Sequence, residues 1–243
     1  MKWKSVLCAA VLSVAFAAPA RADIVGTFNL AGTQDVVVGI NFIDFGANGL
    51  STPGPFLVTS GNATYVGGTI TSGDTGLVKD LTTATVFPVS GFMTFPVTDP
   101  TVTFDLAGVG PGSLNTNCTA LAIGDSCSIF VGSPFVLTLQ AGGQTSIALA
   151  AFGTATDTFS LSTWKGSFTT QFADKTPAQI QADFGCFAGA TAAQCTNPTA
   201  TERSSYSGTF TAIATPVPEP ASLSLLGLGL LGVAARARKR WFA

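Results

Sequence analysis

Glycine-rich turns interrupt the central part of this sequence at short intervals, and the runs between them alternate apolar and polar residues. In one such run Val102, Phe104 and Leu106 alternate with Thr101, Thr103 and Asp105. This period of two is typical of strands with one buried and one solvated face in antiparallel sheets. Many short strands joined by such turns indicate a sandwich or barrel, and we expect an all-β fold, an antiparallel, jelly-roll-like β-sandwich.

The runs that fit strands cover most of the central region. They are residues 24–30, 35–45, 55–59, 65–71, 91–97, 101–106, 128–131, 135–139, 145–152, 158–163, 167–172 and 207–214. Gly142-Gly143 separates two of these runs and predicts a hairpin. One short helix is expected near residues 176–184, because Thr176 can cap it, Pro177 suits its first position and Gly185 stops it.

The two ends of the chain have compositions that set them apart from the central domain, residues 23–215. Residues 1–22 combine an early lysine pair, an apolar stretch and the small residues Ala20 and Ala22 before a cleavage site, which predicts a secretory signal peptide. Residues 216–243 combine a proline-rich spacer, an apolar run expected to form a hydrophobic helix, and a stop-transfer cluster that stays cytoplasmic. That cluster consists of Arg236, Arg238, Lys239 and Arg240.

The C-terminal segment resembles a known sorting signal. Val217-Pro218-Glu219-Pro220, the Leu/Gly-rich apolar run and the basic cluster look like the PEP-CTERM signal of Gram-negative bacteria. The resemblance implies that an exosortase-type enzyme removes the tail after transient anchoring in the inner membrane. It further implies a final place at the cell surface or in the extracellular matrix, associated with exopolysaccharide and biofilm. An ordinary single-pass anchor is the alternative. The stretch around Gly132–Phe135 is also similar to uncharacterised PEP-CTERM domains, which implies no activity.

Four cysteines remain once the signal peptide, with Cys8, is removed. Cys118 and Cys127 have the same spacing as Cys186 and Cys195. Because an exported protein meets an oxidising compartment, we expect disulfides. Four cysteines allow three pairings, of which the two local ones are favoured because each closes a short loop. A metal site is the alternative, although histidine and a C-x-x-C spacing are both missing.

Charge and the lack of histidine exclude several classes of function. The central domain holds twelve acidic and four basic residues, a net charge of −8, which would repel phosphate backbones and makes nucleic acid an unexpected partner. The chain contains no histidine. Serine or cysteine nucleophiles paired with histidine, and zinc sites with histidine ligands, are therefore excluded.

Carboxylates are the remaining candidate catalytic groups, and glycoside hydrolysis would need two of them about 5–10 Å apart. The candidates are Asp74, Asp80, Asp99, Asp105, Asp125, Asp157, Asp183 and Glu202. Aspartates in glycine-rich turns are first of all turn formers, and a loop calcium ion is a further use for them. Trp164, Tyr65 and Tyr206 could stack on a sugar ring, although a lone tryptophan in a sandwich more often packs in its core.

These features predict a non-enzymatic exported protein, a structural or adhesive component of an exopolysaccharide-associated envelope. No catalytic residue, metal ligand or cofactor is expected. A calcium ion bound by aspartates in a loop is the one exception that we keep as an alternative. One alternative is a carbohydrate-binding module, which would need an exposed aromatic strip. The other is a secreted, carboxylate-dependent glycoside hydrolase, which would need two acids converging in a cleft.

Overall fold

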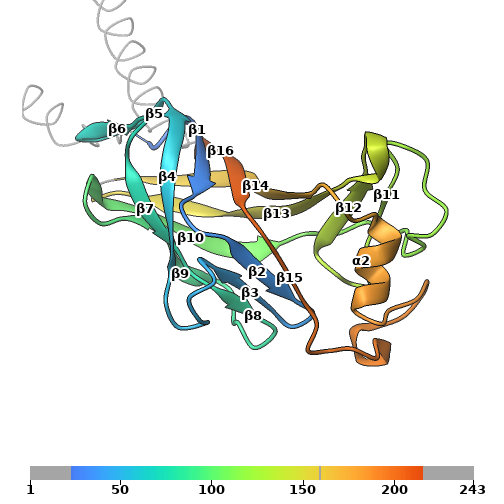
Figure 1. The fold of residues 1–243 in the computed structure, drawn as a ribbon. Helices are drawn as coiled ribbons and strands as arrows, with labels where there is room; N and C mark the ends of the chain where they lie inside the picture. Colours follow the sequence, from blue (N-terminus) through green and yellow to red (C-terminus); the bar gives the residue numbers. More distant parts are fainter. Residues whose placement is uncertain (1–22, 159, 216–243) are drawn as a thin grey trace, which may run out of the picture. The chain divides into compact units, whose positions relative to one another are not determined.

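A computed structural model describes residues 23–158 and 160–215 of the chain. The predicted signal peptide, with Ala20 and Ala22, and the C-terminal segment, with Val217 to Pro220 and the basic cluster, lie outside the described residues. No helix within the described ranges is long and apolar enough to cross a membrane. The described part forms one compact unit made almost entirely of β-strands and turns (Figure 1).

Ten strands form the larger sheet, and all their pairings are antiparallel. They are β1 (Gly26–Gly32), β4 (Gly54–Gly61), β7 (Thr75–Val78), β9 (Val89–Phe95), β10 (Asp99–Val109), β11 (Ser126–Cys127), β12 (Phe135–Leu139), β13 (Thr145–Thr156), β14 (Leu161–Phe172) and β16 (Tyr206–Ala214). Their order across the sheet is β10-β9-β7-β4-β1-β16-β14-β13-β12-β11.

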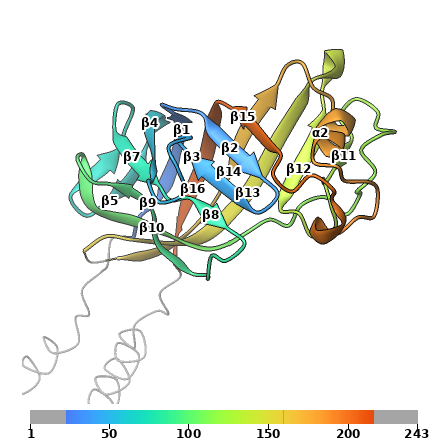
Figure 2. The same ribbon diagram turned by 60° about the horizontal axis from the view of Figure 1, so that its bottom comes forward.

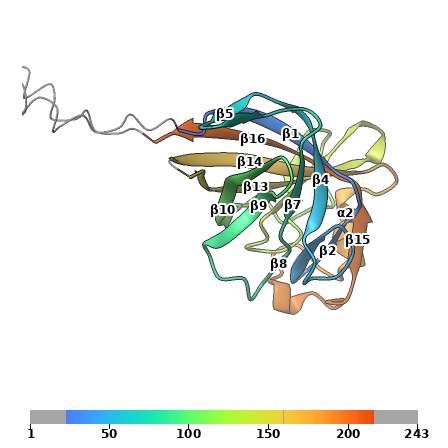
Figure 3. The same cartoon turned by 90° about the vertical axis from the view of Figure 1, so that its left-hand side faces the viewer.

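The larger sheet closes on itself, because β10 also pairs with β13 (Figure 3). The first half of β13 pairs with β12 and its second half pairs with β10. Gly153 makes the close approach possible, since a Cβ there would lie 1.9 Å from the backbone oxygen of Asp105. The all-β class and antiparallel pairing are confirmed, and the expected two-sheet sandwich is refined to a closed sheet with a smaller sheet against it.

The smaller sheet has four strands in the order β15-β2-β3-β8 and is seen face-on in Figure 2. Its members are β2 (Val36–Gly39), β3 (Phe42–Phe45), β8 (Leu81–Thr82) and β15 (Thr201–Ser204). The chain passes from β1 of the larger sheet into β2 of the smaller one, and it returns from β15 of the smaller sheet into β16 of the larger one. A separate hairpin of β5 (Ala63–Tyr65) and β6 (Gly68–Ile70) lies beside the start of β1.

Several expected strands have different limits in the structure. The run 35–45 is two strands, β2 and β3, separated by a turn, and residues 128–131 form a bend and a turn after the two-residue β11. The run 158–163 spans the β13–β14 turn and the first residues of β14. The predicted hairpin at Gly142-Gly143 is confirmed, with the short 3₁₀ helix Ala141–Gly143 between β12 and β13.

Aromatic side chains fill the space inside the closed sheet. Phe28 of β1 stacks on Phe210 of β16, with ring centroids 5.2 Å apart, and Phe210 meets Phe168 of β14 at 5.0 Å. The smaller sheet joins the same core through Phe45 of β3, whose ring lies 4.9 Å from that of Phe168. Both sheets therefore share one hydrophobic core.

The predicted helix is confirmed as α2 (Pro177–Asp183), with Thr176 as its N-cap. The Thr176 hydroxyl accepts from the Gln179 amide, and the Gln179 side chain accepts from the Thr176 amide, which completes a capping box. Ile180 is fully buried and anchors the helix to the core. A second short 3₁₀ helix, Ala192–Gln194, follows it.

Candidate functional site

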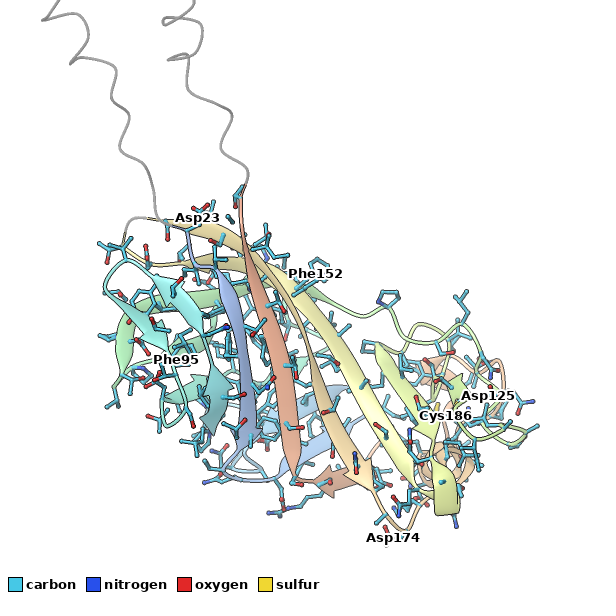
Figure 4. The ribbon with its side chains drawn as sticks, turned by 90° about the horizontal axis from the view of Figure 1, so that it is seen from above. Asp23, Phe95, Asp125, Phe152, Asp174 and Cys186 are labelled. Carbon is cyan, nitrogen blue, oxygen red and sulfur yellow. A yellow bond between two sulfur atoms is a disulfide. The ribbon has the colours of Figure 1, made fainter. Side chains whose placement is uncertain are left out.

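Two disulfide-closed loops lie together at the end of the body that is opposite to Asp23 (Figure 4). Cys118 is bonded to Cys127 and Cys186 to Cys195, so the local pairing expected from the spacing is present. The buried Gln181 side chain of α2 donates to the backbone oxygens of Thr116 and Ile129, which flank the first loop, at 2.9 and 2.8 Å. The Thr116 hydroxyl accepts in turn from the Gly189 amide of the second loop at 2.9 Å. The two loops and α2 therefore form one cross-linked unit.

An apolar hollow with a volume of about 260 Å³ lies between the smaller sheet and the segment that leads into β12. Four rings line it: Phe42, Phe87, Phe130 and Phe135. Its polar lining consists of Asn41 and three threonines, with no charged side chain. Sequence analysis missed this hollow, because its residues come from β2, β3, β8, β10, the loops before β9 and β12, and the second 3₁₀ helix, which no local pattern links.

The candidate carboxylates mainly accept hydrogen bonds from backbone amides. Asp74 accepts from Thr71, Asp125 from Ala122, and Asp105 from Gly91 at 2.6 Å. Asp157 accepts from the amides of Ser160 and Val66, and Asp80 from that of Phe45. These contacts close turns and fix strand ends, as expected for aspartates in glycine-rich turns. None of these carboxylates lines the hollow.

Two further acidic candidates, Asp183 and Glu202, converge on Lys175. The Lys175 Nζ lies 2.8 Å from Asp183 Oδ2 and 2.7 Å from Glu202 Oε1. The hydrogen bonds to Asp183 and then Glu202 raise the pKa of Lys175, against a smaller effect of burial. The Glu202 side chain is almost completely buried on β15, so this cluster connects α2 to the smaller sheet. The three side chains form one ion cluster.

Two of the candidate sugar-stacking rings are in the core. Trp164 and Tyr206 are 2% and 4% exposed, and the Trp164 indole donates to the backbone oxygens of Asp105 and Thr154. The Tyr65 hydroxyl donates to Asp99. The more common role of a lone tryptophan, core packing, is therefore the one that Trp164 has.

Burial raises the pKa of Asp80 from its ordinary 3.8 to about 6, with a smaller contribution from the Asp44 carboxylate. The hydrogen bond from the Phe45 amide acts in the opposite direction. Since the folded state holds this proton more tightly than the unfolded chain, the stabilisation is present below pH 4 and is lost as the pH rises through about 6.

We expect Asp80→Asn to flatten the dependence of stability on pH between 4 and 7. The asparagine cannot titrate but keeps an oxygen for the Phe45 amide. The wild-type free energy of unfolding should fall relative to that of the variant by about 1–2 kcal/mol over this range, since partial solvent exposure reduces the full effect. Urea denaturation at several pH values measures this difference, and parallel curves for the two proteins would contradict it.

Comparisons with known proteins concern the C-terminal segment. The model of the PEP-CTERM protein-sorting motif matches residues 216–239, a range that includes Val217 to Pro220 and the basic residues Arg236, Arg238 and Lys239. No curated protein and no solved structure matches the chain. PEP-CTERM signals are recognised by exosortase and mark exported proteins that pass through the membrane. The chain therefore carries a PEP-CTERM protein-sorting motif at its C-terminus and is an exported substrate of exosortase.

Proposed function

We propose that the mature protein is a non-enzymatic component of the cell surface or extracellular matrix of a Gram-negative bacterium. Its role there would be structural or adhesive, in an envelope rich in exopolysaccharide. The observation that carries this proposal is the sorting motif at residues 216–239 in a protein whose body contains two disulfides. Disulfides of this kind are typical of proteins that work outside the cytoplasm.

The arrangement of the carboxylates supports a structural role over glycoside hydrolysis. A hydrolase would need two acids about 5–10 Å apart, facing a cleft that admits a sugar chain. Here the aspartates bind backbone amides, and Glu202 and Asp183 share Lys175. The 260 Å³ hollow has no acid in its lining. The positions of these side chains favour support of the fold over acid–base chemistry.

The positions of the aromatic rings likewise favour a structural role over a carbohydrate-binding module. Such a module would present a strip of exposed rings, but Trp164 and Tyr206 are buried. The exposed rings Phe87, Phe152 and Phe187 come from three separate segments: the loop before β9, the outer face of β13, and a disulfide loop. A screen of the mature protein on a glycan array tests this comparison, because selective binding of one glycan family would favour the module.

Processing at the sorting motif is tested by intact-mass analysis of the protein from its native host. We expect a chain that begins at Asp23 and ends near Pro218-Glu219-Pro220 in the extracellular or surface fraction. Replacing both Glu219 and Pro220 with alanine should retain the tail and leave the protein in the inner-membrane fraction. Ser222→Ala, two residues beyond the motif, is the matched control and should be processed normally. A full-length tail on the wild-type surface protein would contradict the proposal.

A further inference from the structure

The β13–β14 connection, the start of β10 and the β5–β6 hairpin lie at the same end of the closed sheet (Figure 1), and hydrogen bonds join polar groups of all three. The Tyr65 hydroxyl of β5 donates to Asp99 Oδ1 at the start of β10. The neighbouring Val66 amide donates to Asp157 Oδ2, and Asp157 Oδ1 accepts from the Ser160 amide. Hydrogen bonds therefore connect the three segments, although they are far apart in the sequence.

Three buried oxygens at this end have no hydrogen-bond partner. Among the described residues, the buried side-chain atoms without a partner are Asp99 Oδ2, Ser160 Oγ and Ser162 Oγ. Asp99 and Ser160 are 5% exposed and Ser162 is fully buried. Buried polar atoms are nearly always satisfied, by protein, water or an ion. These three exceptions come from the start of β10 and the start of β14, and a ligand bound at this end of the sheet would satisfy them.

Strand register places the serines near the start of β10. Ser162 pairs with Ala155 of β13, and Ala155 pairs with Phe104 of β10. Paired residues in antiparallel strands point to the same face, so Ser162 shares the inner face with the buried Phe104. Ser160 precedes Ser162 by two residues and is also buried. It therefore lies nearer than Ser162 to the end of the sheet at which Asp99 begins β10.

The charge around Asp99 is negative, and the basic side chains of the body lie elsewhere. Lys175 and Arg203 bind carboxylates near α2 and β2, and Lys79 donates to the Ser90 backbone oxygen. Lys165 follows the buried Trp164 on β14, so it points to the outer, solvated face. Burial, the Asp99 hydrogen bond and the charges of Asp99, Asp74 and Asp157 raise the pKa of Tyr65 to about 12.

We propose that Asp99 Oδ2, with the hydroxyls of Ser160 and Ser162, binds a Ca²⁺ ion at this end of the closed sheet. The donors are all oxygens, which suit hard divalent cations and not zinc or copper. Ca²⁺ accepts six to eight oxygens in flexible geometry, including water, so it does not need three converging carboxylates. Mg²⁺ is disfavoured because it gives up its water reluctantly.

Calcium titration of the mature protein from its host, after treatment with a chelator, tests this proposal. Calorimetry should show saturable binding of one Ca²⁺ per chain, and the melting temperature should rise with calcium concentration, because the ion binds only the folded state. Terbium should bind the same site and emit on excitation of tyrosine, since Tyr65 contacts Asp99. The absence of saturable binding, or equal affinity for Mg²⁺ and Ca²⁺, would overturn the proposal.

Three variants locate the site. Asp99→Asn should weaken Ca²⁺ binding at least tenfold, whereas Asp125→Asn, the same change in a turn at the opposite end (Figure 4), should leave the affinity unchanged. Ser162→Ala keeps the test decisive if Asp99→Asn does not fold, because it removes a hydroxyl that has no partner in the protein. It should bind Ca²⁺ several-fold more weakly while its metal-free melting temperature stays the same or rises. Unchanged affinity in Ser162→Ala and Asp99→Asn would place any bound ion elsewhere.

Discussion

Replacing Phe210 with alanine is expected to lower the free energy of unfolding of the body by about 4 kcal/mol, within the range for buried phenylalanines. Phe210 is fully buried and contacts Phe28, Phe168 and Trp164, with ring centroids 5.0 to 5.8 Å apart. Its ring lies against Gly166, where an added Cβ would come within 2.2 Å of it. These neighbours belong to β1 and β14, which flank β16 in the sheet, so the cavity left by the alanine cannot collapse fully.

The matched control is Phe152→Ala on the outer face of β13 (Figure 4), where the ring is 47% exposed. This change should cost less than about 1 kcal/mol, because nearly half of the residue is already exposed to water. Chemical denaturation of the wild type and both variants gives the two differences. If the two variants lost similar amounts of stability, the closed aromatic core described for this body would be incorrect.

Individual strands, the helix and the disulfides of this protein could be predicted from the sequence, because each is determined by residues close to it in the chain. The alternation of Thr101 to Leu106 places β10, and the Thr176-Pro177 pair with Gly185 places α2. The equal spacing of the cysteines favours the two short disulfides that form. In each case the residues that determine the element lie within a few positions of it.

Closure of the sheet could not be predicted, because the alternation of apolar and polar residues in one strand does not specify which other strand it pairs with. Thr103 pairs with Thr156, which lies far along the chain, and the contact depends on the small size of Gly153. The strand β15 was missed because Glu202 and Arg203 are unfavourable in a strand by themselves. Glu202 is buried there only because Lys175, from the loop before α2, neutralises it.

The functional features divide in the same way into those determined by neighbouring residues and those that depend on the fold. The sorting motif is a linear signal and is evident from the sequence, whereas the cluster around Asp99 depends on three segments that meet only in the fold. Asp99 and Asp157 were candidates as carboxylates, but Ser160 and Ser162 carried no signal. What distinguishes these serines is burial without a hydrogen-bond partner, which is a property of the folded chain alone.

Removing both disulfides should lower the free energy of unfolding by about 5 kcal/mol, which makes it the largest effect expected for this protein. Each bridge closes a loop with a sequence separation of 9, and restricting the unfolded chain by such a loop contributes about 2.5–3 kcal/mol. The replacements are Cys118→Ala with Cys127→Ala, and Cys186→Ala with Cys195→Ala. Alanine is suitable because all four sulfurs belong to buried residues, where a serine hydroxyl would need a new partner.

The loss should begin at the end of the body formed by α2 and the two loops, since Gln181 connects the helix to the first loop and Thr116 connects the first loop to the second. Each double variant should therefore lose about half of the total, and any departure from additivity measures the coupling between the two loops, which Thr116 and Gly189 connect. Wild-type protein in reductant is the control and should match the fourfold variant, which should not itself respond to reductant. A loss below about 1 kcal/mol, or a Cys118–Cys195 link in non-reducing peptide maps, would show that these loops are held by something other than the two short bridges.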